Sequence, residues 1–283
     1  MKRSLLEIHI AVVLFGLAGL FGKLIPLSPI MIVLGRVFFA SITLFTLILL
    51  TKQNLMILPK RDYLFFISLG VILSAHWIAF FTSIQVSTVA VGLLSYSSFP
   101  VFTAFLEPLF FKEKIDKFNI LCAAFCVAGV YLIVPQFDFA NTVFQGVLWG
   151  LLAGLTFSVL TIGNRKLSQR HSSLIIAFSQ DFFATLILFP LYFVIKPVLS
   201  AKDILLLIVL GVFCTAVSHT LFIGAMRRIK AQTASIISAL EPAYGIILAS
   251  ILLKEIPSVG TILGGVVILG TAFTVTVRAT RKP

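Results

Sequence analysis

Long apolar stretches dominate this sequence of 283 residues, and they limit the folds open to it. At least nine of them are long enough to cross about 30 Å of hydrocarbon as α-helices. Hydrophobic residues make up 59% of the chain and charged residues 11%, against about 25% charge in a soluble domain. Backbone groups in lipid must bond within their own segment, which helices achieve. The sequence therefore predicts an all-α integral membrane protein without a separate soluble domain.

One apolar stretch occurs twice. Residues 90–114 read AVGLLSYSSFPVFTAFLEPLFFKEK and residues 231–255 read AQTASIISALEPAYGIILASILLKE, so a shift of 142 positions superposes Pro100 on Pro242. A proline in a spanning helix frees backbone carbonyls and weakens one turn. Interrupted helices at matching places in two halves are typical of the substrate site of a transporter. We therefore predict helix breaks at Pro100 and Pro242.

Hydropathy predicts ten spanning helices. In chain order they cover residues 5–24, 29–50, 63–84, 90–114, 118–134, 144–162, 174–195, 204–225, 231–255 and 259–277. The N-terminus, the loops after even-numbered helices and the C-terminal tail hold 17 of the 22 Lys and Arg residues, and the loops after odd-numbered helices hold four. By the positive-inside rule both termini are predicted to be cytoplasmic. The net charge of +12 therefore reflects orientation rather than binding to nucleic acid.

The ten predicted helices divide into two halves of five. The first half covers residues 1–134, a hinge linker residues 135–143, and the second half residues 144–283. An odd number of helices in each half forces the second half to enter the membrane upside down. The sequence thus predicts two inverted five-helix repeats, related by a pseudo-two-fold axis in the membrane plane.

The sequence resembles the drug/metabolite transporter superfamily, specifically its EamA-type members with ten helices. The resemblance covers nearly the whole chain and rests on three motifs: Gly35-Arg36 with Phe39-Ala40, Leu94 to Pro100 leading to Lys112-Glu113, and Leu240-Glu241-Pro242 leading to Lys254-Glu255. It implies transport of an amino acid, a related compound or a drug, usually as export, in the inner membrane of a bacterium. It also implies a central cavity lined by helices one, three, four, six, eight and nine, with helices five and ten peripheral.

Ionisable residues at membrane depth are costly and usually face a cavity or a partner. Glu241 lies near the middle of the ninth predicted helix, where lost hydration favours the neutral acid, and Tyr244 follows on the same face. Glu241 therefore binds either substrate or a proton, or it is a hydrogen-bonded structural carboxyl. His76 and His219 fall at nearly equivalent places in the third and eighth helices, and each either lines the cavity or is a bonded core histidine.

Three more residues are candidates for the cavity wall, although aromatic residues in spans more often pack or anchor at interfaces. They are Trp77, Tyr96 and Ser97. Two further charges are embedded in the membrane. Arg36 lies about seven residues, or about 10 Å, from one end of its helix, and Asp181 lies similarly far from the opposite end of its own. We predict no direct salt bridge between them, and either a structural role for Arg36 or attraction of an anionic group.

Three functions remain open. A secondary transporter with alternating access is favoured, because no phosphate-binding loop for ATP is present. A membrane enzyme acting on lipid phosphates would need clustered Arg, His and acidic groups near one interface. A channel would need repeated polar faces in identical subunits. We expect a small-molecule substrate, the lipid bilayer and possible protons as partners, a monomer or homodimer, and no cofactor or metal, because Cys122, Cys126 and Cys214 lie scattered inside spans.

Overall fold

The computed structural model describes residues 2–53, 60–111, 117–134, 136–225, 237–238 and 240–281, and its regular secondary structure there is helical. The elements are, in chain order, α1 Lys2–Leu24, α2 Pro29–Leu50, α3 Lys60–Val86, α4 Val89–Tyr96, α5 Phe99–Phe111, α6 Lys117–Ile133, α7 Thr142–Ser168, α8 Ser173–Ile195, α9 Ala201–Gly211, a π-helix Val212–Val217, α10 Ser218–Ala225, α12 Glu241–Leu252 and α13 Val259–Arg281.

These elements form the ten predicted segments. Seven are long and apolar enough to span a membrane, with α4 and α5 counting as one segment and α9 to α10 as another. The shorter apolar helices α6, α12 and α13 supply the other three. The chain is therefore a multi-pass membrane protein of the all-α class. The first part of the predicted ninth helix, at 231–236, and the Lys-Glu pair at 112–113 lie outside the described residues.

Some helices continue beyond their apolar parts. The helix predicted at 144–162 begins at Thr142, where the Asn141 side chain accepts from two backbone N–H groups, and it ends at Ser168. Its last turn carries Arg165 and Lys166, cations that the negative C-terminal end of a helix dipole favours. Hydropathy marks only the part of a helix inside the bilayer, so the prediction was too short.

The two repeated prolines begin helices. The segment predicted at 90–114 is divided at Ser97 and Ser98, and Pro100 is the second residue of α5. Pro242 is likewise the second residue of α12. The first N–H groups of a helix have no intrahelical partner, so a proline at this position sacrifices no helical hydrogen bond. The two prolines thus occupy the same place in their helices, in the register of the sequence repeat.

The two halves pack on each other through a pair of equivalent contacts. A Cβ atom at Gly70 in α3 would lie 2.7 Å from the Cβ of Phe183 in α8. A Cβ atom at Gly211 in α9 would lie 2.7 Å from the Cβ of Phe39 in α2. Only glycine permits either approach. Phe39 and Phe183 share the sequence echo Phe-Phe-Ala, and Gly70 and Gly211 share Leu-Gly-Val. Reciprocal contacts of this kind are characteristic of a two-fold relation.

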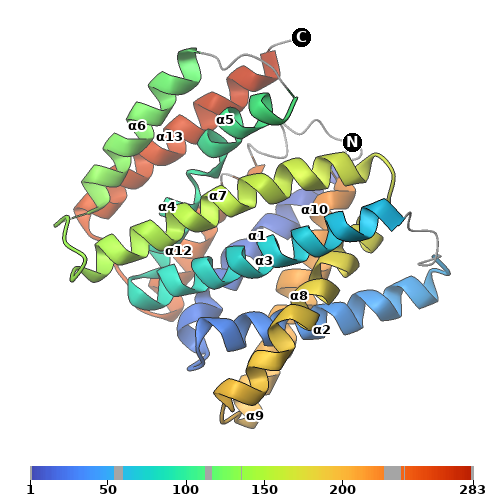
Figure 1. Cartoon of the computed structure of the whole chain (residues 1–283). Coiled ribbons are helices and arrows are strands. Elements are labelled where there is room, and N and C mark those ends of the chain that lie inside the picture. Colours follow the sequence, from blue (N-terminus) through green and yellow to red (C-terminus); the bar gives the residue numbers. More distant parts are fainter. Residues whose placement is uncertain are drawn as a thin grey trace.

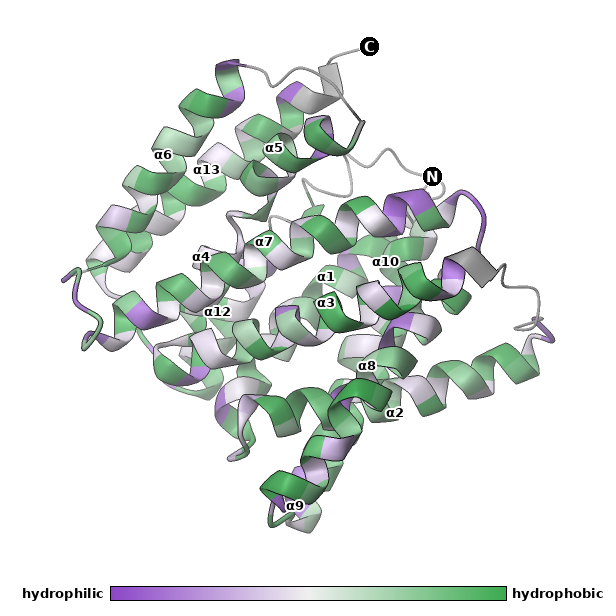
Figure 2. Cartoon of the chain, in the orientation of Figure 1, coloured by the Kyte–Doolittle hydropathy of each residue, from purple (hydrophilic) through white to green (hydrophobic). Residues whose placement is uncertain are grey.

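The helices are arranged so that one pair lies apart from the rest. In Figure 1, α6 and α13 lie side by side along one edge, and α2, α8 and α9 lie together at the opposite edge. Helices α1, α3, α4 and α7 occupy the space between these groups. Figure 2 shows hydrophobic residues along most of the helix surface and hydrophilic residues gathered at helix ends and loops, as a bilayer requires.

Candidate functional site

An interior cavity of about 40 Å³ lies among α1, α3, α7, α8 and α10. Three predicted candidates line it, namely His76, Trp77 and His219. A space of this size holds a few water molecules. The resemblance implied that the fourth and ninth helices also line the cavity, but its described walls take a residue from the seventh helix, α8, instead.

His76 offers an unused acceptor at the cavity. Its Nδ1 lies 2.9 Å from the carbonyl oxygen of Ala153 in α7. A carbonyl only accepts, so in the neutral ring Nδ1 carries the hydrogen and Nε2 is an acceptor. Nε2 is buried and has no hydrogen-bond partner. Aromatic rings surround the imidazole, with Trp77 at 4.6 Å, Phe157 at 5.2 Å and Tyr96 at 5.6 Å between ring centroids.

Trp77 and His219 bring the two halves of the chain together. Their rings are stacked, with centroids 6.2 Å apart and planes inclined by 18°. Phe15 of α1 packs edge-on against His219 at 5.6 Å. The indole Nε1 of Trp77 is buried and has no acceptor. The third and eighth predicted helices, which carry the equivalent residues His76 and His219, are thus in direct contact through the rings of Trp77 and His219.

Arg36 is fully buried in α2. Its Nε donates to the Thr215 hydroxyl at 3.0 Å and its Nη2 donates to the carbonyl oxygen of Cys214 at 3.3 Å. The guanidinium carbon lies 3.5 Å from the centroid of the Trp77 ring, a cation–π contact. Its third nitrogen, Nη1, is buried without a partner.

Both acceptors of Arg36 belong to the π-helix at Val212–Val217. There the Thr215 hydroxyl donates to the carbonyl of Leu210, five residues earlier, at 2.9 Å. A π-helical turn departs from the regular α-helical hydrogen-bond ladder, and such turns are frequent at functional sites. The irregular turn therefore supplies two oxygens to the guanidinium at membrane depth.

Asp181 is a second buried charge that lacks a partner. Its side chain is fully buried in α8, and neither carboxylate oxygen accepts a hydrogen bond. Arg36 acts on Asp181 and on Glu241 electrostatically. No hydrogen bond joins the Arg36 guanidinium to the Asp181 carboxylate. The two opposite charges thus share the interior without a hydrogen bond between them, and neither belongs to the described lining of the cavity.

Glu241 is buried as the first residue of α12, where the positive end of the helix dipole favours a carboxylate. Pro242 is buried beside it. Tyr244 is half-buried and packs against a cluster formed with Ile8 and Val12 of α1. None of these three candidates belongs to the described lining of the cavity.

Tyr96 and Ser97 end α4, next to Pro100 and outside the described cavity lining. Tyr96 is buried behind His76 and Phe157. The Ser97 hydroxyl donates to the carbonyl of its own helix at Leu93, at 2.8 Å, and so is satisfied. These residues support the cavity wall rather than form it.

Two amides that we did not single out as site residues, Asn164 and Gln180, also line the cavity and hydrogen-bond to each other. Gln180 is a polar residue inside an apolar stretch, and that signal could have identified it, whereas Asn164 follows the predicted helix 144–162 and precedes Arg165 and Lys166 directly, where a polar residue is unremarkable. The wall residues Phe15, Phe157 and Phe222 carried no such signal, because the chain has 28 phenylalanines.

Hydrogen bonds join distant segments at one end of the molecule. Glu255 Oε2 accepts from the backbone N–H of Val89, the first residue of α4, at 2.9 Å. Lys23 Nζ donates to the carbonyl of Ser87 at 2.8 Å. The first contact links the second half to the first, and the second links α1 to the loop after α3. We call these two contacts the Glu255–Lys23 closure.

Other contacts join segments at the opposite end. Glu107 pairs with Arg165 of α7. His171 Nε2 lies 2.9 Å from Asp62. The cysteines are buried, and the described residues contain no group of His, Cys, Asp or Glu that could hold a metal ion.

Comparison with known proteins places this architecture among transporters. Residues 3–134 and 144–277 each match the model of the EamA-like transporter family. An uncharacterized transporter of Bacillus subtilis (strain 168) is 25% identical over 277 residues, which cover 96% of this chain and 89% of the relative. One of Archaeoglobus fulgidus is 25% identical over 262 residues, covering 93% and 92%.

Two more similarities are shorter or more distant. The mouse protein solute carrier family 35 member G1 is 34% identical over 84 residues, which cover 29% of this chain and 23% of that protein. A solved crystal structure matches with a TM-score of 0.68 and 17% identity, over 99% of both chains. At that identity the likeness concerns the fold.

Proposed function

Because this chain belongs to the EamA-like transporter family, we propose that it carries a small organic solute across the membrane by alternating access, with net export. The chain is a membrane transporter rather than an enzyme. We further propose that the solute bears both a carboxylate and an amino group, as an amino acid or a related compound does.

The observation that carries this proposal is the set of buried polar atoms without partners. Among the described residues this set includes the donors Arg36 Nη1 and Trp77 Nε1 and the acceptors His76 Nε2 and the Asp181 carboxylate. The hydroxyls of Ser95 and Thr220 complete it. Buried polar groups are nearly always hydrogen-bonded, so each unsatisfied one requires an explanation. A solute with a carboxylate for the guanidinium and an ammonium for the aspartate would satisfy both charges, while the aromatic walls would hold its apolar part.

The size of the cavity favours a carrier over a channel. At about 40 Å³ it is far smaller than typical small-molecule pockets, which measure about 300–1,000 Å³. Helices must therefore separate before such a solute enters. The Glu255–Lys23 closure lies at the end predicted to face outward, which supports a state closed to the outside.

We propose that Glu241 couples transport to protons. Glu241 is buried at the start of a helix and interacts electrostatically with Arg36. Only the second half of the chain has a carboxyl at this place, because the residue before Pro100 in the first half is Phe99. A carboxyl in such a place can exchange a proton for the charge of a solute. Competition between proton and solute would make flux depend on pH.

The first experiment measures solute binding by thermal shift, with zwitterionic amino acids compared with their amides and with decarboxylated amines. A ligand that binds the folded state raises the melting temperature by mass action. We expect only compounds that retain both charges to raise it in wild type, and Arg36→Gln to abolish the shift. Equal shifts from the amines and the parent amino acids would remove the carboxylate from the proposal.

The second experiment compares flux by wild type and Glu241→Gln in proteoliposomes across a range of pH. The variant keeps the shape of the side chain but cannot ionise. We expect it to lose coupled transport, and its flux to lose its dependence on pH, while the protein stays folded. Equal rates and equal pH profiles would assign Glu241 to structure.

We also propose the arrangement of the chain in the membrane. The repeats would be residues 1–134 and 144–283, joined by the hinge 135–143, with both termini in the cytoplasm of a bacterial cell. The two matches of the family model and the distribution of Lys and Arg support this division.

A further inference from the structure

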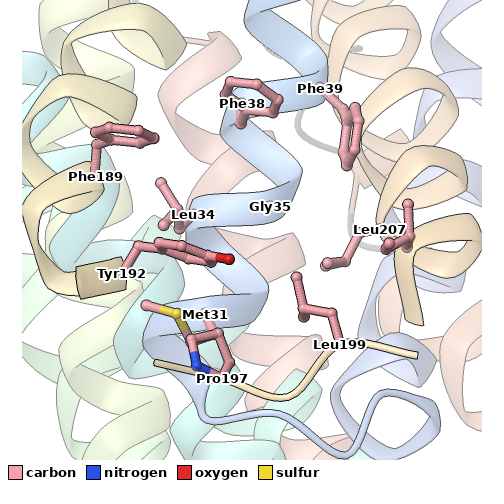
Figure 3. Close-up of a pocket in the computed structure, with 11 residues that line it drawn as sticks. Met31, Leu34, Gly35, Phe38, Phe39, Phe189, Tyr192, Pro197, Leu199 and Leu207 are labelled. Atoms are coloured by element: carbon pink, nitrogen blue, oxygen red, sulfur yellow. The ribbon is translucent and has the colours of Figure 1, made fainter. Parts of the chain in front are cut away.

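A second hollow lies on the outer surface of the helices and shares no lining residue with the polar cavity. It measures about 240 Å³ and is formed by α2, α8, α9 and the loop between α8 and α9. Figure 3 shows Phe189 and Tyr192 on one side, Leu207 on the other, α2 between them, and the loop at Pro197 and Leu199 below. We call it the α2–α8–α9 groove. Its walls are apolar apart from the Tyr192 hydroxyl.

The length of the groove along α2 matches the depth of one leaflet of a bilayer. Along α2 it extends from Met31, near the helix start, to Phe39, about 12 Å at 1.5 Å per residue. Half of the hydrocarbon core is about 15 Å thick. Wall residues such as Phe189 and Ile204 are exposed, so the groove faces lipid. Tyr192 lies one turn from the end of α8, where tyrosines anchor helices at the interface.

Local hydrogen bonds fix the mouth of the groove. Lys196 ends α8 in the left-handed conformation, with φ 47°, and its N–H donates to the carbonyl of Tyr192 at 2.9 Å. Ser200 and Asp203 form a capping box that starts α9. The Asp203 carboxylate is thereby occupied by the backbone and hydroxyl of Ser200. These bonds therefore hold the loop at the mouth in one defined conformation.

Two lysines lie next to the mouth of the groove in sequence. Lys196 precedes the lining residue Pro197, Lys202 is the second residue of α9, and both side chains are exposed. Lys202 also interacts electrostatically with the Asp203 carboxylate, so Lys196 is left as the uncompensated positive charge of the pair.

We propose that the α2–α8–α9 groove is a binding site for an anionic phospholipid of this leaflet. One acyl chain lies against α2, and the phosphate headgroup lies between Lys196 and Lys202. The apolar walls suit an acyl chain, and the depth of the groove matches a single leaflet. The two lysines would select an anionic headgroup by charge.

The test is native mass spectrometry of delipidated protein titrated with phosphatidylglycerol or phosphatidylcholine of identical acyl chains. We expect wild type to retain one phosphatidylglycerol at least threefold more often than one phosphatidylcholine. The double variant Lys196→Gln, Lys202→Gln should lower that preference to about one. The control Lys254→Gln removes a lysine that is also exposed and left-handed at a helix end on the same side, and it should leave the preference unchanged.

A second variant separates the groove from the charges. Ile204→Trp adds bulk on the lip of the groove, at an exposed position of α9, and should reduce retention of both lipids at least threefold. The proposal is overturned if the double lysine variant keeps the preference of wild type. It is also overturned if Ile204→Trp retains lipid as wild type does, or if lipid-free wild type is dimeric and Ile204→Trp is monomeric.

Discussion

The guanidinium of Arg36 is held at membrane depth by a side chain from the π-helical turn, and this bond can be tested with one near-isosteric substitution. Thr215→Val removes the hydroxyl that accepts from Arg36 Nε at 3.0 Å and leaves that donor buried without a partner. We expect a loss of about 1–3 kcal/mol in unfolding free energy, the cost of a buried unsatisfied group, and a lower melting temperature. The measurement is thermal unfolding in detergent.

The matched control is Thr46→Val, because the Thr46 hydroxyl bonds only to its own helix at Ile42, on an exposed face of α2. It should change stability by less than about 0.5 kcal/mol. Equal melting temperatures for the two variants would contradict a special role of Thr215. The sequence predicted that Arg36 would lie at membrane depth and would not form a direct salt bridge with Asp181. It could not predict Thr215, because a π-helical turn leaves no trace in hydropathy and shifts which side chains of its helix face α2.

At the scale of elements, the N-terminus of α4 is capped from the other half of the chain. Glu255 Oε2 accepts from the Val89 N–H, one of the N–H groups that have no partner within α4. We expect Glu255→Ala to loosen this end, so that a cysteine at the buried position Ala90 reacts at least fivefold faster with a membrane-impermeant maleimide. Glu255→Gln, which retains an acceptor, should have a smaller effect. Glu107→Ala, at the opposite end, should have none, and equal labelling of all three variants would exclude capping by Glu255.

The elements themselves were largely predictable. A run of apolar residues as long as the bilayer is thick can form little except a helix, so ten segments follow from the sequence. The sequence predicted helix breaks at Pro100 and Pro242, and the two prolines lie at equivalent places, as the second residues of α5 and α12. The cavity walls were harder to predict. His76 and His219 were identified because polar residues are rare in spans, whereas Phe157 resembles any packed phenylalanine.

For the whole molecule, the distribution of Lys and Arg predicts its orientation. Reporter fusions after residue 283 and within the linker at Asp138 should lie on opposite sides of the membrane, because five helices separate them. Alkaline phosphatase, active outside the cytoplasm, and a fluorescent protein, active within it, supply the two readouts. The same side for both sites would contradict the ten-helix topology. Moving the fusion site from Asp138 to another residue of the linker controls for local effects of insertion.

Alternating access requires the end closed by Glu255 and Val89 to open in every cycle, so holding that end closed should stop transport. The variant Val89→Cys, Glu255→Cys, with the three buried cysteines replaced by alanine, can be joined by a short linker that reacts with thiols and is cleaved by reductant. We expect the linked protein to transport at less than a tenth of its unlinked rate and reductant to restore the rate.

Binding of solute from the opposite side should persist in the linked protein, since the cavity residues are untouched. Each single cysteine variant, treated in the same way, controls for the reagent. Val89 and Glu255 lie outside the cavity lining, so loss of both binding and flux in the linked protein would indicate distortion of the structure. Undiminished flux in the linked protein would show that this end stays closed during transport, and it would refute alternating access through it.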